Sequence, residues 1–219
     1  MSTLERRLPW IIVTLAALAG LAGFWLGQSV YSDAANTNPP TRLQSALLYP
    51  QPRDLPDFEL TRSDGTRIGK ADWKGSWRLL FFGFANCPDV CPTTMSTLKV
   101  ALAELRKTGA TAEVAVSFVS VDPERDQLEA LGRYVAFFDP SFEAATGTPE
   151  QLQTLTQAVG VVFMKTATGS GALDYTIDHS ASIMIIDPQG RLAGLIRPPH
   201  SAAAIAADLS QLLARKPGK

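Results

Sequence analysis

Cysteine and histidine are scarce in this sequence. Its 219 residues include two cysteines and two histidines. Two cysteines cannot form the several disulfide bonds that hold small secreted folds together, so cross-linking is not the basis of this fold. A site for a soft metal ion would also have few residues to draw on, because thiolates and imidazoles are its usual ligands.

An excess of charge of either sign is also missing. The chain has 20 Lys and Arg residues against 21 Asp and Glu residues, which gives a formal net charge of −1. Proteins that bind nucleic acid need a basic surface to neutralise phosphates, so this balance argues against nucleic acid as a partner. We also find no P-loop, no GxGxxG after a strand and no GxSxG.

A long run near the N-terminus has no charged residue. The run covers residues 8–32, and residues 10–26 form its apolar centre. As a helix, this centre would span roughly 26 Å, slightly less than the ~30 Å hydrocarbon thickness of a bilayer. Trp10 and Trp25 lie near its ends, where aromatic rings prefer the membrane interface. We therefore expect a transmembrane anchor over residues 10–31.

Charges on either side of the run predict its orientation. Arg6 and Arg7 precede it and Asp33 follows it, so the positive-inside rule leaves residues 1–9 in the cytoplasm and exports the rest. No cysteine follows the run that could carry a lipid, and no long presequence rich in Arg and Ser comes first. We expect a single-pass protein of a bacterial inner membrane with its C-terminal domain in the periplasm. The alternative is a signal peptide cleaved near residues 32–34.

The segment that follows is rich in Pro, Asn and small residues. It covers residues 32–55 and predicts a partly extended linker. At ~3.1 Å per residue such a linker could reach roughly 70 Å from the membrane, which would let the domain search for a membrane-bound partner. We expect one folded domain over residues 56–219, and a content of 46% hydrophobic and 19% charged residues suits a domain with its own core.

Strand and helix patterns alternate along this domain. Residues 78–84 and 115–121 are continuous apolar runs, typical of strands buried on both faces. Further strands are expected at residues 161–165, 181–187 and 191–196, hairpin turns at 63–66 and 187–190, and helices at 92–109, 127–138, 149–160 and 201–216. The Gly-rich stretch 166–175 predicts a loop. This order predicts an α/β fold of three layers with a mixed central sheet.

Both cysteines stand in the pentapeptide CPDVC. Pro88 and Pro92 disfavour helical backbone at Cys87 and Cys91, which places the pair on a strand-to-helix loop with Cys91 as the helix N-cap. The positive end of that helix would favour thiolate and lower the cysteine pKa. Thiolates bind soft metals, Cu(I) above all, and also carry out disulfide exchange. The motif therefore leaves a redox couple, a metal clamp or both open.

Three blocks of the sequence resemble the Sco/SenC family of copper chaperones. They are FGFANCPDVCPTTMSTL, SVDPERDQLEALGRYV (residues 120–135) and YTIDHSASIMIIDPQG (residues 175–190). The resemblance implies a thioredoxin-like fold with an extra β-hairpin, and a copper ion bound by Cys87, Cys91 and His179. It also implies assembly of the dinuclear copper centre of cytochrome c oxidase subunit II, with that subunit or a similar copper-acceptor protein as the partner. We expect a metallochaperone rather than an enzyme.

Other functions stay open for the same residues. A thiol–disulfide oxidoreductase would act on partner cysteines through Cys87 and Cys91 without metal, although dedicated members mostly use CxxC. Peroxide reduction would need one cysteine to form sulfenic acid. A structural zinc site would need a fourth ligand, for which His200 is the remaining nitrogen.

Weaker candidates surround these residues. We interpret Asp178 as a residue that could orient His179, Asp89 as a charged neighbour of the cysteines, and His200 as a capping or surface residue. Two methionines are expected in the core: Met95 and Met164. Three charged residues of the second block are interpreted as a helix start with ion pairs: Asp122, Arg125 and Asp126.

Overall fold

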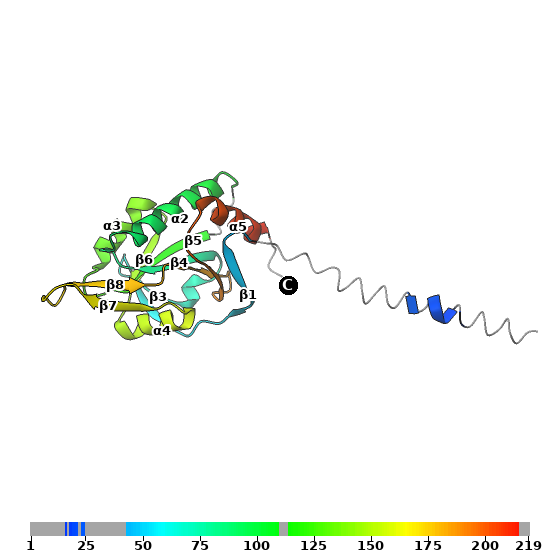
Figure 1. Ribbon diagram of the computed structural model, residues 1–219, viewed down its shortest axis with the longest axis horizontal. Helices are drawn as coiled ribbons and strands as arrows, with labels where there is room; N and C mark the ends of the chain where they lie inside the picture. The colour runs from blue at the N-terminus through cyan, green and yellow to red at the C-terminus, as the bar shows by residue number, and fades with distance from the viewer. Residues whose placement is uncertain (1–15, 17, 22, 25–42, 110–113, 215–219) are drawn as a thin grey trace, which may run out of the picture. The chain divides into compact units, whose positions relative to one another are not determined.

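The structure is a computed structural model that describes residues 16, 18–21, 23–24, 43–109 and 114–214 (Figure 1). The chain divides into two compact units, Met1–Arg42 and Leu43–Lys219. Within the expected anchor 10–31 the described residues are helical, and the other residues of the anchor, like the expected cytoplasmic segment 1–9, lie outside the described part. Among the helices that the structure describes, none is long and apolar enough to cross a membrane.

The second unit is built on a mixed sheet of eight strands. Their order is β1-β10-β9-β4-β5-β6-β2-β3. The strands are β1 (Ala46–Arg53), β2 (Glu59–Arg62), β3 (Arg67–Gly69), β4 (Trp77–Gly83), β5 (Val114–Ser120), β6 (Glu143–Thr146), β9 (Ile183–Ile186) and β10 (Leu192–Ile196). The central pairs β4–β5 and β5–β6 are parallel, while β9 pairs antiparallel with β4. The apolar run of β4 is explained by its place, because Leu79 to Phe82 are fully buried.

Four α-helices cover the two faces of this sheet. They are α2 (Val90–Arg106), α3 (Leu128–Phe138), α4 (Pro149–Val159) and α5 (Ala202–Ala214), and a short 3-10 helix, η1 (Lys70–Trp73), follows β3. Figure 1 shows α2, α3 and α5 on one side of the sheet and α4 on the other. The parallel crossovers β4–α2–β5 and β5–α3–β6 require α2 and α3 to share a side, because such crossovers are right-handed. The predicted three-layer α/β class with a mixed sheet agrees with this arrangement.

A second, two-stranded sheet stands apart from the first. Its strands are β7 (Phe163–Ala167) and β8 (Tyr175–His179), which pair antiparallel with Phe163 opposite His179. Most side chains of β7 are exposed. Of the stretch 166–175, which was expected to be a loop, residues 168–174 connect the two strands, while its ends belong to β7 and β8. This hairpin carries one of the three predicted ligands.

The linker expected over residues 32–55 is wrong for its second half. Residues Ala46–Arg53 form β1, which pairs antiparallel with β10. The prolines at positions 50 and 52 argued against a strand here. However, β1 is at the edge of the sheet, where a missing backbone N–H need not remove a hydrogen bond between strands. The buried carboxylate of Asp208 on α5 accepts the backbone N–H groups of Gln44, Ser45 and Ala46, at 2.7, 2.8 and 2.8 Å.

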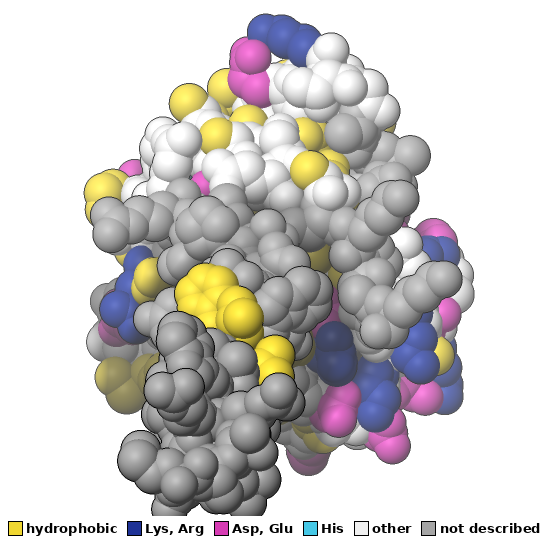
Figure 2. Space-filling view, turned by 90° about the vertical axis from the view of Figure 1, so that its right-hand side faces the viewer, with side chains coloured by type: hydrophobic (Ala, Val, Ile, Leu, Met, Phe, Trp, Pro, Cys, Tyr) yellow, Lys and Arg dark blue, Asp and Glu magenta, His cyan; other side chains and the backbone are white. Residues whose placement is uncertain are grey.

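Charge on the surface follows the balanced composition. On the face shown in Figure 2, the described Lys and Arg side chains lie interspersed with Asp and Glu side chains. In the described part of the first unit, the exposed side chains include Leu18, Leu21 and Phe24.

Candidate metal centre

Cys87 lies in the segment between β4 and α2, and Cys91 lies at the start of α2. The N–H of Cys87 donates to the carbonyl of Phe84 at 3.2 Å, which forms a turn directly after the strand. The N-cap of α2 is Asp89, so Cys91 is in the first helical turn, and its expected position as N-cap is wrong. Pro92 is tolerated one residue later because N–H groups of the first turn have no acceptor within the helix.

Both cysteines are buried free thiols. Cys91 is completely buried and Cys87 nearly so. Burial raises the pKa of the Cys91 thiol well above its ordinary value, and the nearby Cys87 adds to the rise. For Cys91 the expected lowering of the pKa is therefore wrong, because the loss of hydration is the largest effect on this thiol.

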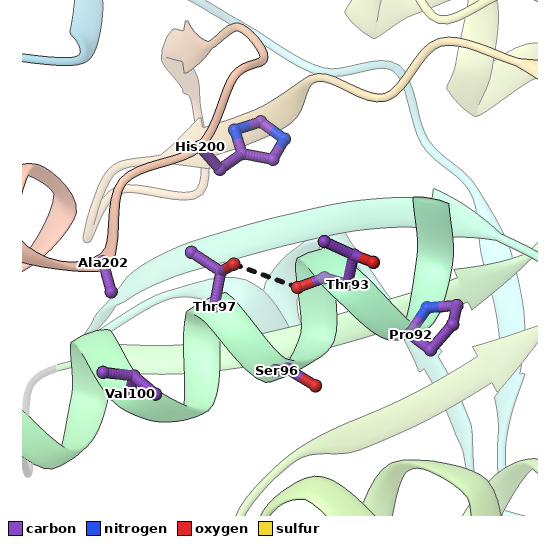
Figure 3. A pocket seen from close by; sticks show the side chains of 7 residues that line it. All are labelled: Pro92, Thr93, Ser96, Thr97, Val100, His200 and Ala202. Atoms are coloured by element: carbon purple, nitrogen blue, oxygen red, sulfur yellow. Dashed lines mark hydrogen bonds between the residues drawn. The ribbon is translucent and has the colours of Figure 1, made fainter. Parts of the chain in front are cut away.

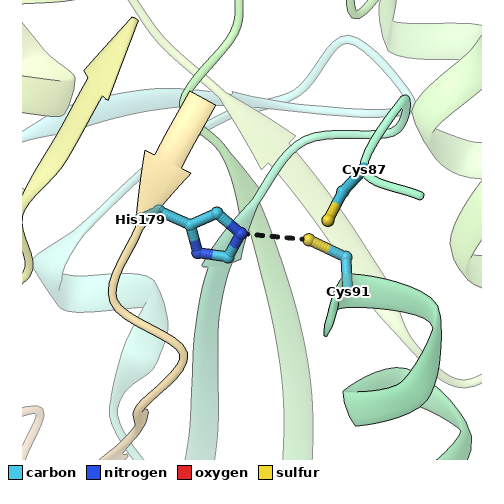
Figure 4. A group of neighbouring side chains, drawn as sticks. All are labelled: Cys87, Cys91 and His179. Carbon is cyan, nitrogen blue, oxygen red and sulfur yellow. Dashed lines mark hydrogen bonds between the residues drawn. The ribbon is translucent and has the colours of Figure 1, made fainter. Parts of the chain in front are cut away.

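His179 is the last residue of β8, and its ring turns toward the sulfurs (Figure 4). Its Nε2 lies 3.3 Å from Cys91 Sγ, and its Nδ1 lies 3.2 Å from the carbonyl oxygen of Ser180. A proton on Nδ1 would donate to that carbonyl and leave the Nε2 lone pair facing the sulfur. The rings of Phe81 and Phe84 meet the imidazole edge-on at 5.9 and 6.0 Å between centroids. Burial lowers the pKa of His179, which favours the neutral ring.

The three predicted ligands come together in one place. One possible ligand atom from each of Cys87, Cys91 and His179 lies within 4.8 Å of the other two. The group offers two sulfurs and one nitrogen, a donor set suited to soft and borderline metals. Three protein ligands would also leave a coordination position open for a ligand from elsewhere.

Gly83, which the sequence reasoning missed, makes room for this group. A Cβ at this position would lie 2.6 Å from Cys91 Sγ and 2.9 Å from a ring carbon of Phe118, closer than real Cβ contacts allow. A glycine that interrupts a buried apolar strand marks a close approach of other atoms, and the run RLLFFGF contains that signal.

Residues of the second sequence block (120–135) form hydrogen bonds with one another and with the segment that leads to the cysteines. Asp122 is fully buried and its Oδ2 accepts from Arg125 Nε at 2.5 Å, which confirms the expected ion pair. The carboxylate of Asp126 accepts from Ser120 Oγ at 2.6 Å and from the N–H of Ala85 at 2.9 Å, and burial raises the pKa of Asp126. The expected helix start is wrong, because α3 begins only at Leu128.

Asp178 does not orient His179. Its Oδ2 accepts from Thr166 Oγ1 at 3.0 Å, while the His179 Nδ1 faces the carbonyl of Ser180. Adjacent residues of a strand point to opposite sides, which separates these two side chains. Met95 is in the core as expected, but Met164 on β7 is 63% exposed.

His200 lies outside the three-residue group. Its Nε2 is 2.8 Å from the carbonyl oxygen of Ala181. The ring borders an open groove of about 480 Å³ beside the first turns of α2 (Figure 3). The other lining residues are Pro92, Thr93, Ser96, Thr97, Val100 and Ala202. The alternative of a zinc site with His200 as fourth ligand has no support in this geometry.

Fold and site together define a class of protein: a thioredoxin-like domain in which two thiols and one imidazole converge at the start of a helix. The family model described as SCO1/SenC matches residues 50–214. The chain therefore belongs to the SCO1/SenC family.

Relatives with a similar sequence or structure include bacterial proteins. A protein of Stutzerimonas stutzeri, named as copper-binding, is 31% identical over 213 residues, which cover 97% of each chain. The structure of Bradyrhizobium japonicum ScoI with copper bound is 34% identical, with a TM-score of 0.64 over 71% of this chain and 97% of that one. BsSco, described as a member of the Sco family of cytochrome c oxidase assembly proteins, shares the fold at 20% identity and a TM-score of 0.55, over 78% of this chain and 99% of its own.

The Gly83→Ala substitution is expected to disturb the cysteine segment. The added methyl group would force Cys91 Sγ and the Phe118 ring apart, and overpacking of this kind costs about 1–3 kcal/mol of unfolding free energy. Urea unfolding of the reduced chain measures the loss. Gly132→Ala is the control, because its methyl would meet Ser63 at 3.2 Å, away from the sulfurs. Equal unfolding midpoints for wild type and Gly83→Ala would contradict the crowding described here.

His179 is expected to titrate below its ordinary pKa of 6.5, because burial disfavours the charged ring. The unfolded chain then binds the proton first, so the associated stability is complete above pH 6.5 and decreases as the pH falls through the folded-state pKa. NMR titration of the imidazole signals, assigned with a His179→Gln variant, measures this value. A midpoint at or above 6.5 would show that the ring is hydrated.

Proposed function

We propose that this chain is a copper metallochaperone that delivers copper to cytochrome c oxidase subunit II during assembly of the dinuclear copper centre. The observation that carries the proposal is the convergence of Cys87, Cys91 and His179, with one ligand atom from each within 4.8 Å of the others. Support also comes from the copper named for the Stutzerimonas stutzeri and Bradyrhizobium japonicum relatives. The cytochrome oxidase role rests on the family resemblance and on the description of BsSco.

The donor set fits copper as cargo. Thiolate sulfur and neutral imidazole nitrogen are ligands that Cu(I) prefers. Because burial keeps the Cys91 thiol protonated and the His179 ring neutral, copper binding has to displace a proton from the sulfur but not from the ring nitrogen that faces it. Copper loading therefore releases protons, as expected whenever thiols become metal ligands.

Handover to the acceptor follows from the number of ligands. With three protein ligands, a sulfur or nitrogen of the acceptor can enter the open position before any ligand of this chain leaves. Copper then passes from one protein to the other by stepwise ligand exchange and is never free in water. The two cysteines lie just before and within the first turn of α2, and the histidine lies on the separate β7–β8 hairpin, so the ligands need not leave together.

We further propose that residues 10–31 anchor the chain in a bacterial inner membrane and hold the copper-binding domain on the periplasmic side. The proposal rests on the uncharged run with Arg6 and Arg7 before it. Since β1 begins at Ala46, the tether between anchor and domain is shorter than the sequence suggested.

Reduction of partner disulfides is the second candidate function. The closeness of the two free thiols supports it, because Cys87 and Cys91 could form a disulfide with each other after giving their electrons to a partner. The raised pKa of Cys91 disfavours that residue as the attacking thiolate, so in this function the attack would fall to Cys87.

Single substitutions of the three ligands should each weaken copper binding sharply. We expect Cys87→Ser, Cys91→Ser and His179→Ala to raise the Cu(I) dissociation constant by on the order of 100-fold or more, since even outer partners of a ligand contribute 10–100-fold. Anaerobic titration of the reduced full chain against a competing Cu(I) chelator measures this. His200→Ala is the control and should bind as wild type, because His200 lies outside the group.

Unchanged affinity in His179→Ala would remove this residue from the site. A second measurement separates the two functions: the copper-loaded chain is mixed with the soluble copper-acceptor domain of subunit II, and the absorption of the dinuclear centre is followed. If the chain delivers copper, the appearance of this absorption requires His179. If the chain is instead a reductase, the metal-free His179→Ala variant reduces the acceptor's disulfide as well as the metal-free wild type does.

A further inference from the structure

His179 is held differently from the two cysteines. Cys87 lies in the short segment between β4 and α2, and Cys91 lies in α2 itself; β4 belongs to the main sheet and α2 to the layer packed on it. His179 ends β8 in the two-stranded sheet, whose side chains are mostly exposed or half-buried. The backbone that carries the imidazole therefore lies outside the main sheet, and further contacts have to hold this strand beside the sulfurs.

Arg125 supplies such contacts at the opposite end of β8. Its Nη1 donates to the carbonyl oxygen of Tyr175 at 2.6 Å, and its guanidinium lies 3.8 Å from the centroid of the Tyr175 ring. The Tyr175 hydroxyl donates to Asp122 Oδ1 at 2.6 Å, and the other oxygen of this carboxylate accepts from Arg125 Nε. With 13% of the Arg125 side chain and none of the Asp122 side chain exposed, water competes little for these bonds.

The same guanidinium also reaches the cysteine side of the site. It lies 5.6 Å from the centroid of the Phe84 ring, within the range of a cation–π contact. Phe84 is almost fully buried, meets the His179 ring edge-on, and accepts the N–H of Cys87 with its carbonyl. Arg125 is thus in contact with the strand that carries the imidazole and with the residue against which the imidazole packs.

We propose that Arg125 is the positioning residue that holds His179 in place as the third copper ligand. The inference rests on the proposed copper function of the same site. An ion pair that only stabilised the fold would need the Asp122 contact alone. The flat, forked guanidinium instead bonds Asp122 and Tyr175 while it lies over the rings of Tyr175 and Phe84, and a lysine ammonium cannot reproduce that geometry.

The matched control is Lys165 on the same hairpin. Its Nζ pairs with Glu124 at 2.7 Å and lies 4.6 Å from the Tyr175 ring centroid, but both charged side chains are substantially exposed. Lys165→Met therefore removes a contact between the hairpin and the segment that contains Arg125 without changing the packing of Phe84.

The test compares copper ligation by the full chain in the variants Arg125→Met, Arg125→Lys and Lys165→Met. In Arg125→Met we expect roughly tenfold weaker copper binding, and a weaker nitrogen hyperfine coupling of the Cu(II)-loaded chain in electron paramagnetic resonance. Arg125→Lys should be intermediate and Lys165→Met should match wild type. In a His179→Ala background, Arg125→Met should change the affinity less than twofold, because the residue acts through the imidazole.

An equal loss of affinity in both backgrounds, or unchanged nitrogen coupling in Arg125→Met, would overturn the proposal. If Arg125→Met does not fold, Arg125→Lys is measured in the wild-type and His179→Ala backgrounds instead, and the same two outcomes support or overturn the proposal. The readouts need copper binding but no delivery, so a failure of delivery leaves them intact. If the wild type bound no copper, the proposed function would fail, and the imidazole NMR signals of the metal-free chain would still test the positioning. Those signals should shift in Arg125→Met but not in Lys165→Met.

Discussion

The 3.3 Å contact between Cys91 Sγ and His179 Nε2 is the contact on which the site depends. It joins two residues that are 88 positions apart in the sequence, one in the first turn of α2 and one at the end of β8. The buried strand β4 fixes the start of α2, and the absence of a side chain at Gly83 leaves space for the sulfur. Phe81 and Phe84 fill the space around the imidazole.

Burial has opposite effects on the two partners of this contact. It raises the pKa of Cys91 and lowers that of His179, so both groups are neutral near pH 7. A neutral thiol and a neutral imidazole can share a hydrogen bond without an unpaired charge in an apolar environment. Copper has to replace the thiol proton to enter the site, which links loading to pH and to the reduced state of both sulfurs.

Much of this arrangement could be predicted from the sequence, but only where the signal is local. The apolar run of β4 and the turn at residues 187–190 depend on neighbouring residues, and the structure agrees with them. Of the CPDVC motif, Cys87 lies in the predicted loop, but Cys91 lies in the first turn of α2. The choice of His179 came from the family resemblance, because no local pattern shows which loop faces the cysteines. Strand β6 was missed, since its four residues are too few for a pattern.

Other predictions were wrong or incomplete where a property depends on contacts between distant parts of the chain. The pKa of Cys91 depends on how much water the fold excludes, which the position at a helix end does not reveal. The prolines near β1 indicated a linker, but an edge strand tolerates them. The contacts of Arg125 with Tyr175 and Phe84 connect segments about 40–50 positions away, so the DPERD block alone indicated only an ion pair.

X-ray absorption of the full chain loaded anaerobically with one equivalent of Cu(I) tests the central claim most directly. The account predicts two sulfur neighbours at about 2.3 Å and one nitrogen neighbour at about 2.0 Å, by analogy with the corresponding zinc bonds. Copper bound to sulfur alone, with no nitrogen in its coordination shell, would contradict the convergence of Cys87, Cys91 and His179 on one ion.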